Sequence, residues 1–463
     1  MPWREQLLPE QMLRAAIVAP ETRVRRVLVE VADVGVFEPD PSDTPCSGPF
    51  TTLADRHTET TVPELSIDPV EPDNLSQPDQ LPLLIGEASL EQHLLTTRTL
   101  EHCLLLPGWI PNSEIDAVRR RIAPFGGAIA EIPVRKGVSA PTSHAVNPVS
   151  GAFRPLVTTY ATVPYRDVDP TLFAVAAYMV MFGMMFGDVA HGLALVILGL
   201  WANYFGSRRM PSARRAAPFL IGAGTAATAF GFLYGEAFGP TGLVPTLWLR
   251  PLDEPEKLLV AGLVLGACLL ALTFILATIN RWREAGPTVA LYDASGIGGS
   301  LLFVGVAAFV GGTVGSLTWL SQAGIAAGVV GIALTFTGLF FDAGLSPAGF
   351  AQAMVEMFDT VLRLGSNIVS FTRLAAFGLT HAVLTEVTWD GTVSLWERSS
   401  LFGYIGAVAL FVVGNVAAFT LGALVGGIQA LRLEYYEMFS RLFAVQGRPF
   451  EPWHIPTRKL ETQ

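Results

Sequence analysis

The feature that most constrains this chain is one arginine inside a long apolar segment, AQAMVEMFDTVLRLGSNIVSFTRLAAFGLTHAVLTE, at residues 351–386. The segment contains no proline, and its pattern predicts one long helix of about 54 Å. From Leu364 to Thr385, Arg373 is the only charged residue. A hydrocarbon core is only about 30 Å thick. Arg373 is therefore expected near the middle of a tilted or protruding membrane helix.

An arginine at that depth costs at least about 2.5–3.5 kcal/mol, so it needs compensating neighbours. A helix turns by about 100° per residue, so seven polar residues of the segment fall within about 60° of one line drawn along the helix surface. They are Asp359, Arg363, Ser366, Ser370, Arg373, Thr380 and His381. The stripe predicts the wall of an ion pathway, turned away from lipid. The alternative is a buried arginine that joins neighbouring helices by hydrogen bonds.

The rest of the chain supports a membrane protein, since only 15% of its 463 residues are charged and 51% are hydrophobic. A soluble protein carries about 25% charged residues. Nothing in the composition indicates a nucleic-acid partner. Eight apolar segments predict eight membrane spans, at residues 171–187, 188–206, 216–235, 256–280, 296–318, 323–343, 351–386 and 399–440.

The distribution of arginines predicts the orientation of these spans. The N-terminus, MPWREQLLPE, has no signal-peptide core and is expected in the cytoplasm. Arginines then follow the second, fourth and eighth spans, at positions 208, 209, 214, 215, 281, 283, 441 and 448. This agrees with the positive-inside rule. We expect a multi-pass protein of the cell membrane, a prokaryotic plasma membrane, with both termini cytoplasmic.

The first third of the chain predicts a small cytoplasmic domain. Strand–helix–strand patterns at residues 11–40 and 103–134 suggest an α+β fold over residues 1–165. A stretch rich in proline, serine and aspartate, at about residues 39–82, interrupts it and is predicted to be a disordered acidic linker without its own core. Residues 166–463 form the predicted transmembrane domain. The fold class is thus mainly α, with two long tilted C-terminal helices.

The last span carries a second arginine. Residues 401–431 contain no charge, and Arg432 follows them, with Gln429 and Tyr436 on the same helical face. An arginine that extends its side chain to the cytoplasmic interface would give the same pattern. The three cysteines have no metal-site spacing, and the chain has no phosphate-binding loop of the G-x-x-x-x-G-K-[ST] type. We therefore expect no metal, no cofactor and no ATP binding.

Four segments together resemble the membrane stator subunit of V-type and archaeal-type rotary ATPases, called subunit a or subunit I. They are VPYRDVDPTLF with FGMMFGDVAHG, then FGFLYGEAFG, SNIVSFTRLAAFGLTHAVL and IQALRLEYYEMFSRLFAVQGRPFEPW. The resemblance covers about residues 155–455. HCLLLPGWIPNSEIDAVRRRI also looks like the proximal lobe of the family's cytoplasmic arm.

The resemblance implies roles for particular residues. Arg373 corresponds to the stator arginine that faces the rotor ring, and Arg432 to a second arginine expected close to it. Together with the helical faces, the resemblance gives the expected ion-translocating set of Arg373, Arg432, His381, Asp359, Ser370, Gln429 and Glu236. The expected structural polar residues in the membrane are Asp188, His191 and Asn367. There are two departures. The family's last helix has a glutamate where this chain has Gly422, and the family's cytoplasmic arm is usually much longer.

The implied function is ion conduction through two aqueous half-channels to the carboxylates of a proteolipid rotor ring. Protons are the first expectation for the ion and sodium the second. Peripheral-stalk and central-stalk subunits and the lipid bilayer are the other implied partners, and ATP chemistry belongs to other subunits. The competing hypotheses are a stand-alone ion-coupled secondary transporter and a purely structural membrane anchor. The first lacks an internal repeat, and the second leaves the Arg373 stripe unexplained.

Overall fold

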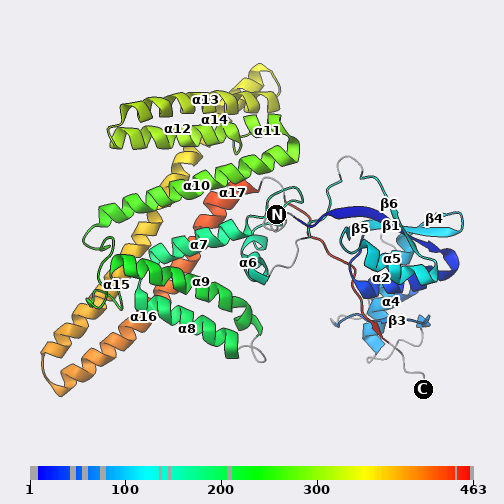
Figure 1. Cartoon of the computed structure of the whole chain (residues 1–463), viewed down its shortest axis with the longest axis horizontal. Helices are drawn as coiled ribbons and strands as arrows, with labels where there is room; N and C mark the ends of the chain where they lie inside the picture. Colours follow the sequence, from blue (N-terminus) through cyan, green and yellow to red (C-terminus); the bar gives the residue numbers. More distant parts are fainter. Residues whose placement is uncertain are drawn as a thin grey trace. The chain divides into compact units, whose positions relative to one another are not determined.

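The chain is described by a computed structural model, which covers residues 9–41, 48–54, 61–72, 80–134, 138–143, 148–205, 211–443 and 446–458. It divides into two compact units (Figure 1). The first comprises residues 1–145, 162–165 and 447–463, and the second comprises residues 146–161 and 166–446. The C-terminal residues therefore cluster with the first unit and not with the apolar helices.

An antiparallel sheet forms the centre of the first unit. Its long strands are β1 (Met12–Pro20) and β5 (Cys103–Pro111), paired from Met12 opposite Pro111 to Pro20 opposite Cys103. The strand order is β2-β5-β1-β6, with β2 at Glu38–Pro39 and β6 at Ala128–Glu131. The short β4 (Arg98–Leu100) also pairs with β5.

Helices α2 (Val24–Val34), α4 (Leu81–Thr96) and α5 (Ile115–Ile122) lie on one side of this sheet (Figure 1). The short 3-10 turns Glu21–Arg23 and Ala123–Phe125 flank α2 and α5. Val27 and Val31 of α2 are fully buried against Ile17 of the sheet. These helices present one apolar face to the strands, as an amphipathic pattern predicts. The predicted small α+β region is confirmed.

The prediction of a disordered linker is wrong for its described residues. Helix α3 (Pro49–Ala54) packs against Leu81 and Leu84, and β3 (Leu65–Ser66) pairs in parallel with β7 (Thr457–Arg458). Leu65 is fully buried in the main core of the unit. Local composition misled the prediction because the strand that pairs with β3 lies at the far end of the chain. Residues 42–47, 55–60 and 73–79 lie outside the described residues.

The second unit is helical in its described residues. Its helices are α6 (Pro148–Thr158), α7 (Thr171–Met185), α8 (Val189–Phe205), α9 (Pro211–Tyr234), α10 (Pro255–Ala285), α11 (Pro287–Tyr292), α12 (Ile297–Val314), α13 (Thr318–Asp342), α14 (Pro347–Ser370), α15 (Thr372–Glu397), α16 (Leu401–Leu433), the π-helix η5 (Glu434–Phe439) and α17 (Ser440–Leu442). Each predicted span is mostly helical. Among the described residues, six helical stretches are long and apolar enough to cross a membrane. Helices α7 and α8 are shorter, so a count of eight spans is not confirmed.

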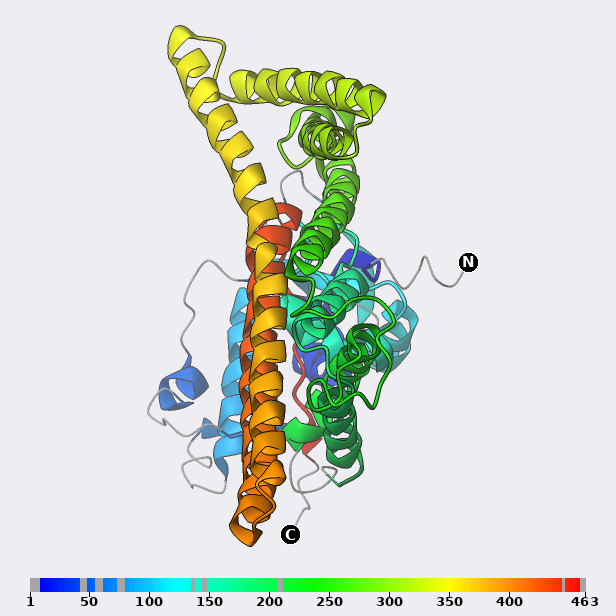
Figure 2. The same cartoon turned by 90° about the vertical axis from the view of Figure 1, so that its left-hand side faces the viewer.

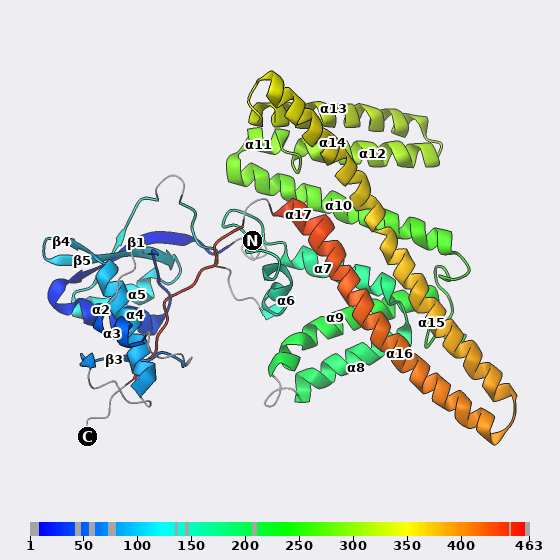
Figure 3. The ribbon, with the colours of Figure 1, turned by 180° about the vertical axis from the view of Figure 1, so that it is seen from behind.

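Helices of this unit pack at close range through glycines. A Cβ added at Gly305 of α12 would lie 2.4 Å from the backbone nitrogen of Gly328 in α13, and one at Gly192 of α8 would lie 2.5 Å from that of Thr228 in α9. Small residues let membrane helices approach in this way. Helices α15 and α16 run side by side as a long hairpin and cross the other helices obliquely (Figure 3).

The segment predicted as one helix is two helices. Helix α14 ends at Ser370 and α15 begins at Thr372, and the ribbon changes direction between them (Figure 2). Phe371 at the break is fully buried. A Cβ at Gly266 of α10 would lie 2.2 Å from its ring, so Phe371 fills a space that only glycine leaves open. The sequence of the segment alone could not show this, because the break depends on a contact with another helix.

Candidate functional site

Arg373 lies in the first turn of α15, two residues after the buried Phe371. Its side chain is 31% exposed, and its Nη1 atom lies 3.7 Å from Oε1 of Glu437. Glu437 is buried and belongs to η5, the π-helix that follows α16. Single π-helical turns of this kind frequently occur at functional sites. The helix break and the π-turn thus bring an arginine and a carboxylate together.

Two more predicted residues lie around Glu437. Ser370, the last residue of α14, makes a side-chain hydrogen bond with it, and Arg432 of α16 interacts with it electrostatically. Arg373 and Arg432 therefore share one acidic neighbour. Arg432 itself is exposed.

Glu434 and Glu437 were missed by the sequence analysis. Glu434 is fully buried, and neither of its carboxyl oxygens has a hydrogen-bond partner among the described residues. The available signal was two carboxylates, three residues apart, directly after an uncharged apolar run. Acidic residues within a membrane segment are candidates for function by default.

A second polar cluster lies further along α15. Asp188, between α7 and α8, accepts hydrogen bonds from the backbone nitrogens of His191 (2.9 Å) and Gly239 (3.1 Å). The rings of His191 and His381 are 5.4 Å apart between centroids. All three side chains are buried, and candidate ligand atoms of the three lie within 4.8 Å of one another. Residues that the sequence analysis assigned to different roles therefore form one cluster.

Glu236 lies at the edge of this cluster. It follows α9, its side chain is buried, and its backbone oxygen accepts a hydrogen bond from Val189 at the start of α8 (2.9 Å). Its carboxylate interacts electrostatically with Asp188 and Glu386. Three acidic groups from separate elements thus interact with one another, and one of them, Asp188, lies beside the two buried histidines.

The remaining predicted residues occupy other surroundings. Asp359 is exposed and pairs with Arg363 at 2.6 Å. The side-chain amide of Asn367 can be oriented so that its nitrogen donates to the backbone carbonyl of Arg363 (2.9 Å) and its oxygen accepts from the Arg441 guanidinium (3.2 Å). The Gln429 side-chain oxygen is buried without a hydrogen-bond partner among the described residues. The expected stripe therefore divides into three environments. Asp359 pairs with Arg363, Ser370 and Arg373 lie beside Glu437, and His381 belongs to the buried cluster.

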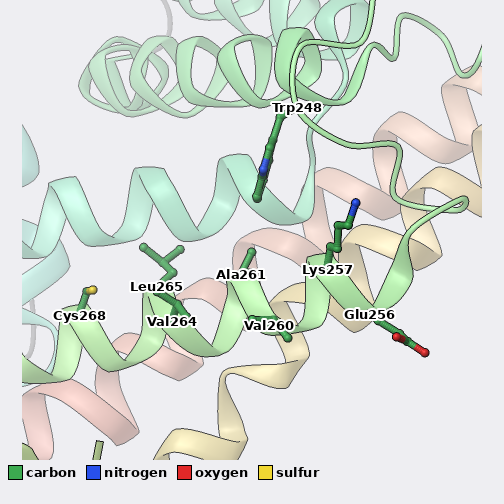
Figure 4. A pocket seen from close by; sticks show the side chains of 8 residues that line it. All are labelled: Trp248, Glu256, Lys257, Val260, Ala261, Val264, Leu265 and Cys268. Atoms are coloured by element: carbon green, nitrogen blue, oxygen red, sulfur yellow. The ribbon is translucent and has the colours of Figure 1, made fainter. Parts of the chain in front are cut away.

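A groove of about 730 Å³ runs along α10, from Glu256 and Lys257 to Cys268, with Trp248 on its other side (Figure 4). Val260, Val264 and Leu265 supply most of its remaining lining. The groove contains neither of the predicted arginines nor the histidines. It is an apolar surface feature and not part of the candidate ion site.

Comparison with known proteins supports the predicted resemblance. The V-type ATPase 116kDa subunit family model matches residues 92–222. Among the relatives are proteins named A-type ATP synthase subunit I. That of Aeropyrum pernix is 28% identical over 374 residues, which is 70% of this chain and 53% of the relative. That of Archaeoglobus fulgidus is 26% identical over 427 residues, 81% of this chain and 62% of the relative.

These matches confirm the predicted resemblance to subunit I of V-type and archaeal-type rotary ATPases. The subunit I of Halobacterium salinarum, 25% identical, matches 78% of this chain and 62% of its own length. The chain thus spans just over half to about three fifths of the length of these relatives. The six long apolar helical stretches of the described residues suggest a multi-pass membrane protein, and the relatives are named subunit I of an A-type ATP synthase.

Gly422, where the resemblance leads one to expect a glutamate, lies in a closely packed place. At Gly422 of α16, a Cβ would lie 2.7 Å from Nδ1 of His381 and 2.7 Å from the ring of Phe186. The space that the family's glutamate would need is therefore occupied. In this chain, Asp188 provides a carboxylate beside His381 instead.

Proposed function

We propose that this chain is the membrane stator subunit of a V/A-type rotary ATPase and that it forms the two half-channels through which ions reach and leave a proteolipid rotor ring. The observation that carries the proposal is the position of Arg373. It lies at a helix break, with Glu437 on one side and the buried cluster of Asp188, His191 and His381 about 12 Å away along α15.

The electrostatic role of Arg373 follows from its charge. A rotor carboxylate crosses lipid only when it is neutral, because a bare charge in lipid is very costly. Beside a guanidinium the ionised carboxylate is favoured, so the carboxylate releases its ion there. The fixed charge of Arg373 also prevents a continuous path for cations. Ion flow must then pass through the rotor, which couples transport to rotation.

The polar residues on either side of Arg373 supply the two half-channels. The first group consists of Ser370 at the end of α14, Gln429 and Arg432 near the end of α16, and Glu437 in η5. We assign this group to the cytoplasmic side by the positive-inside rule. The second group is His381, Asp188, His191 and Glu236, next to the outer loop after α9. Asp359 extends the polar surface of α14 toward the cytoplasm. Protons are the expected ion, with sodium as the alternative.

The partners follow from this role. The rotor ring contacts the surface that exposes Arg432 and the half-buried Arg373, and stalk subunits contact the α+β unit. The subunit does not hydrolyse or form ATP itself; that activity lies on other subunits. Its place is the cell membrane, with both termini in the cytoplasm.

Purification in mild detergent tests the proposal. The stator hypothesis predicts that nucleotide-binding subunits and a small proteolipid co-purify with this chain. A monomer that purifies alone and transports an ion in vesicles would overturn it in favour of a secondary transporter.

A further inference from the structure

We propose that Asp188, His191 and His381 form a binding site for a divalent transition-metal cation of the Zn²⁺ class. The three residues come from the α7–α8 connection, the first turn of α8 and the middle of α15. One candidate ligand atom from each lies within 4.8 Å of the other two, and all three side chains are buried. Binding does not depend on the proposed function; only its effect on ion flow does.

Unpaired nitrogens carry the inference. Both ring nitrogens of His191 and both of His381 are buried without a hydrogen-bond partner among the described residues. These two side chains are only 2% and 3% exposed. Buried polar atoms in folded proteins are nearly always paired, so four such nitrogens in one place point to a bound partner. A metal ion would accept one lone pair from each imidazole.

The donor set selects the class of cation. Two imidazoles and one carboxylate are ligands that Zn²⁺ uses with tetrahedral geometry, whereas Mg²⁺ and Ca²⁺ prefer oxygen ligands. The candidate ligand atoms now lie within 4.8 Å of one another. Metal–ligand bonds near 2.1 Å require these atoms to lie roughly 3.3 Å apart, and small rotations of the imidazole rings would bring them closer. Asn415 offers a fourth position, because its Oδ1 is buried without a partner among the described residues and its side chain faces His191.

The surroundings hold the ligands in place. Two backbone N–H groups, from His191 and Gly239, fix the Asp188 carboxylate. Hydrogen bonds of this kind orient a ligating carboxylate. Glu236 is a further buried acidic side chain that interacts electrostatically with Asp188. The carboxylate ligand is therefore oriented before any ion enters the site.

Aromatic rings enclose the cluster. Phe186 packs 4.7 Å from His381, and Phe238 packs 5.4 Å from His191 on the outer side. Phe238 has a φ of 54°, in the left-handed region that residues other than glycine rarely occupy. It belongs to the non-helical loop between α9 and α10, which offers the entry path.

The inference departs from the sequence-based expectation of no metal site. Asp188 and His191 are three residues apart, which is a common spacing, and His381 lies far along the chain. Only the packing of α7, and of its connection to α8, against α15 brings them together, so no spacing rule could have found them.

Cobalt binding to the purified full chain, without a polyhistidine tag and after chelator treatment, tests the site. Co²⁺ in a tetrahedral site has a strong visible absorption, and we expect it at a single equivalent, reversed by Zn²⁺ and unaffected by excess Mg²⁺. His191→Gln, His381→Gln and Asp188→Asn should each weaken binding at least about tenfold, or about 1.4 kcal/mol. The exposed His102→Gln is the matched control and should bind as the wild type.

Equal binding by all three variants, or no cobalt absorption in the wild type, would overturn the inference. If a variant fails to fold, the thermal stability of the wild-type chain with added metal ions still tests the site. Zn²⁺ should raise its melting temperature and Mg²⁺ should not, because a ligand that binds the folded state stabilises it. No shift with Zn²⁺ would contradict the site.

A flux assay separates this inference from the proposed function. Zn²⁺ added on the outer side should block ion flow in vesicles containing the wild-type complex. The block, taken as a fraction of each protein's own ion flow without Zn²⁺, should be at least about tenfold less sensitive to Zn²⁺ in His191→Gln. Binding without a block would refute the half-channel role of the cluster and leave the metal site standing. A block that is equal in the variant would refute the metal site and leave the half-channel in place.

Discussion

The contact between Phe371 and Gly266 determines the break that positions Arg373, and a double-mutant cycle tests it. Phe371 is fully buried, so Phe371→Ala should destabilise the fold by about 3–5 kcal/mol. Gly266→Ala should destabilise it as well. Its Cβ would lie 2.2 Å from Cγ of Phe371, well inside the usual contact distance of about 3.5–4.0 Å between carbons.

The two changes should compensate one another. With alanine at position 371 the clash disappears, and the new methyl group at position 266 fills part of the cavity. The double variant should therefore be more stable than the sum of the two single effects predicts, by at least about 1 kcal/mol. Unfolding of the full chain in mixed micelles, with a rising fraction of denaturing detergent, measures the three free energies.

Gly311→Ala in α12 is the matched control, since a Cβ there has no atom within 4 Å. It should leave stability unchanged or raise it slightly, because alanine favours a helix. Additive effects of Phe371→Ala and Gly266→Ala would refute the contact, and with it the explanation of the helix break.

Three further predictions concern the site and the α+β unit. Glu437→Gln should lower coupled pumping about tenfold, about 1.4 kcal/mol, without loss of assembly, because Arg373 loses its ionic partner at 3.7 Å. Gly422→Glu, which restores the family pattern, should lower both stability and activity, because its Cβ meets His381 at 2.7 Å. Burial lowers the pKa of His93 to about 4. The unfolded value is near 6.5, so the unit should keep full stability above pH 6.5 and lose up to about 3 kcal/mol as the pH falls toward 4.

Each of these predictions has a control and a contradicting result. Pumping by Glu437→Gln at the wild-type rate would show that the ion pair has no role. Gly426→Ala should be tolerated, since its Cβ has no contact closer than 3.8 Å, and equal damage from both glycine changes would contradict the steric argument. For His93, the measurement is the hydrogen-exchange rate of the α4 amides at falling pH, corrected for intrinsic exchange. The wild type should lose protection in α4 as the pH falls toward 4. This loss should disappear in His93→Gln and remain in the control His102→Gln.

Much of the fold could be predicted from local pattern. A helix and a strand bury residues at different spacings in the sequence. The periodicity of Val24–Val34 therefore predicts a helix, and the apolar run Cys103–Pro111 predicts a strand. The apolar spans were recognisable for the same reason. Leu65 was not, because its partner strand lies near the C-terminus and acidic residues surround it in sequence.

The site could be predicted only in part. Arg373 and His381 stand out because charge and titratable groups are rare in membrane helices. The ion pair with Glu437 depends on a π-turn, and the cluster with Asp188 and His191 depends on how separate helices pack. Helical-wheel reasoning assumed one straight helix from residue 351 to residue 386. The structure has two helices that meet at Phe371, with Asp359 in the first and His381 in the second, and the two residues lie in different surroundings.

The most direct test of the proposed function is ion pumping by vesicles that contain the assembled complex with Arg373→Ala, followed with a pH-sensitive dye with and without a sodium gradient. The account predicts intact assembly, no ATP-driven pumping and a passive leak, because no fixed charge then separates the half-channels or favours the ionised rotor carboxylate. Arg373→Lys should restore little activity, since lysine lacks the planar fork and loses its proton readily when desolvated. Pumping by Arg373→Ala at the wild-type rate would contradict the account.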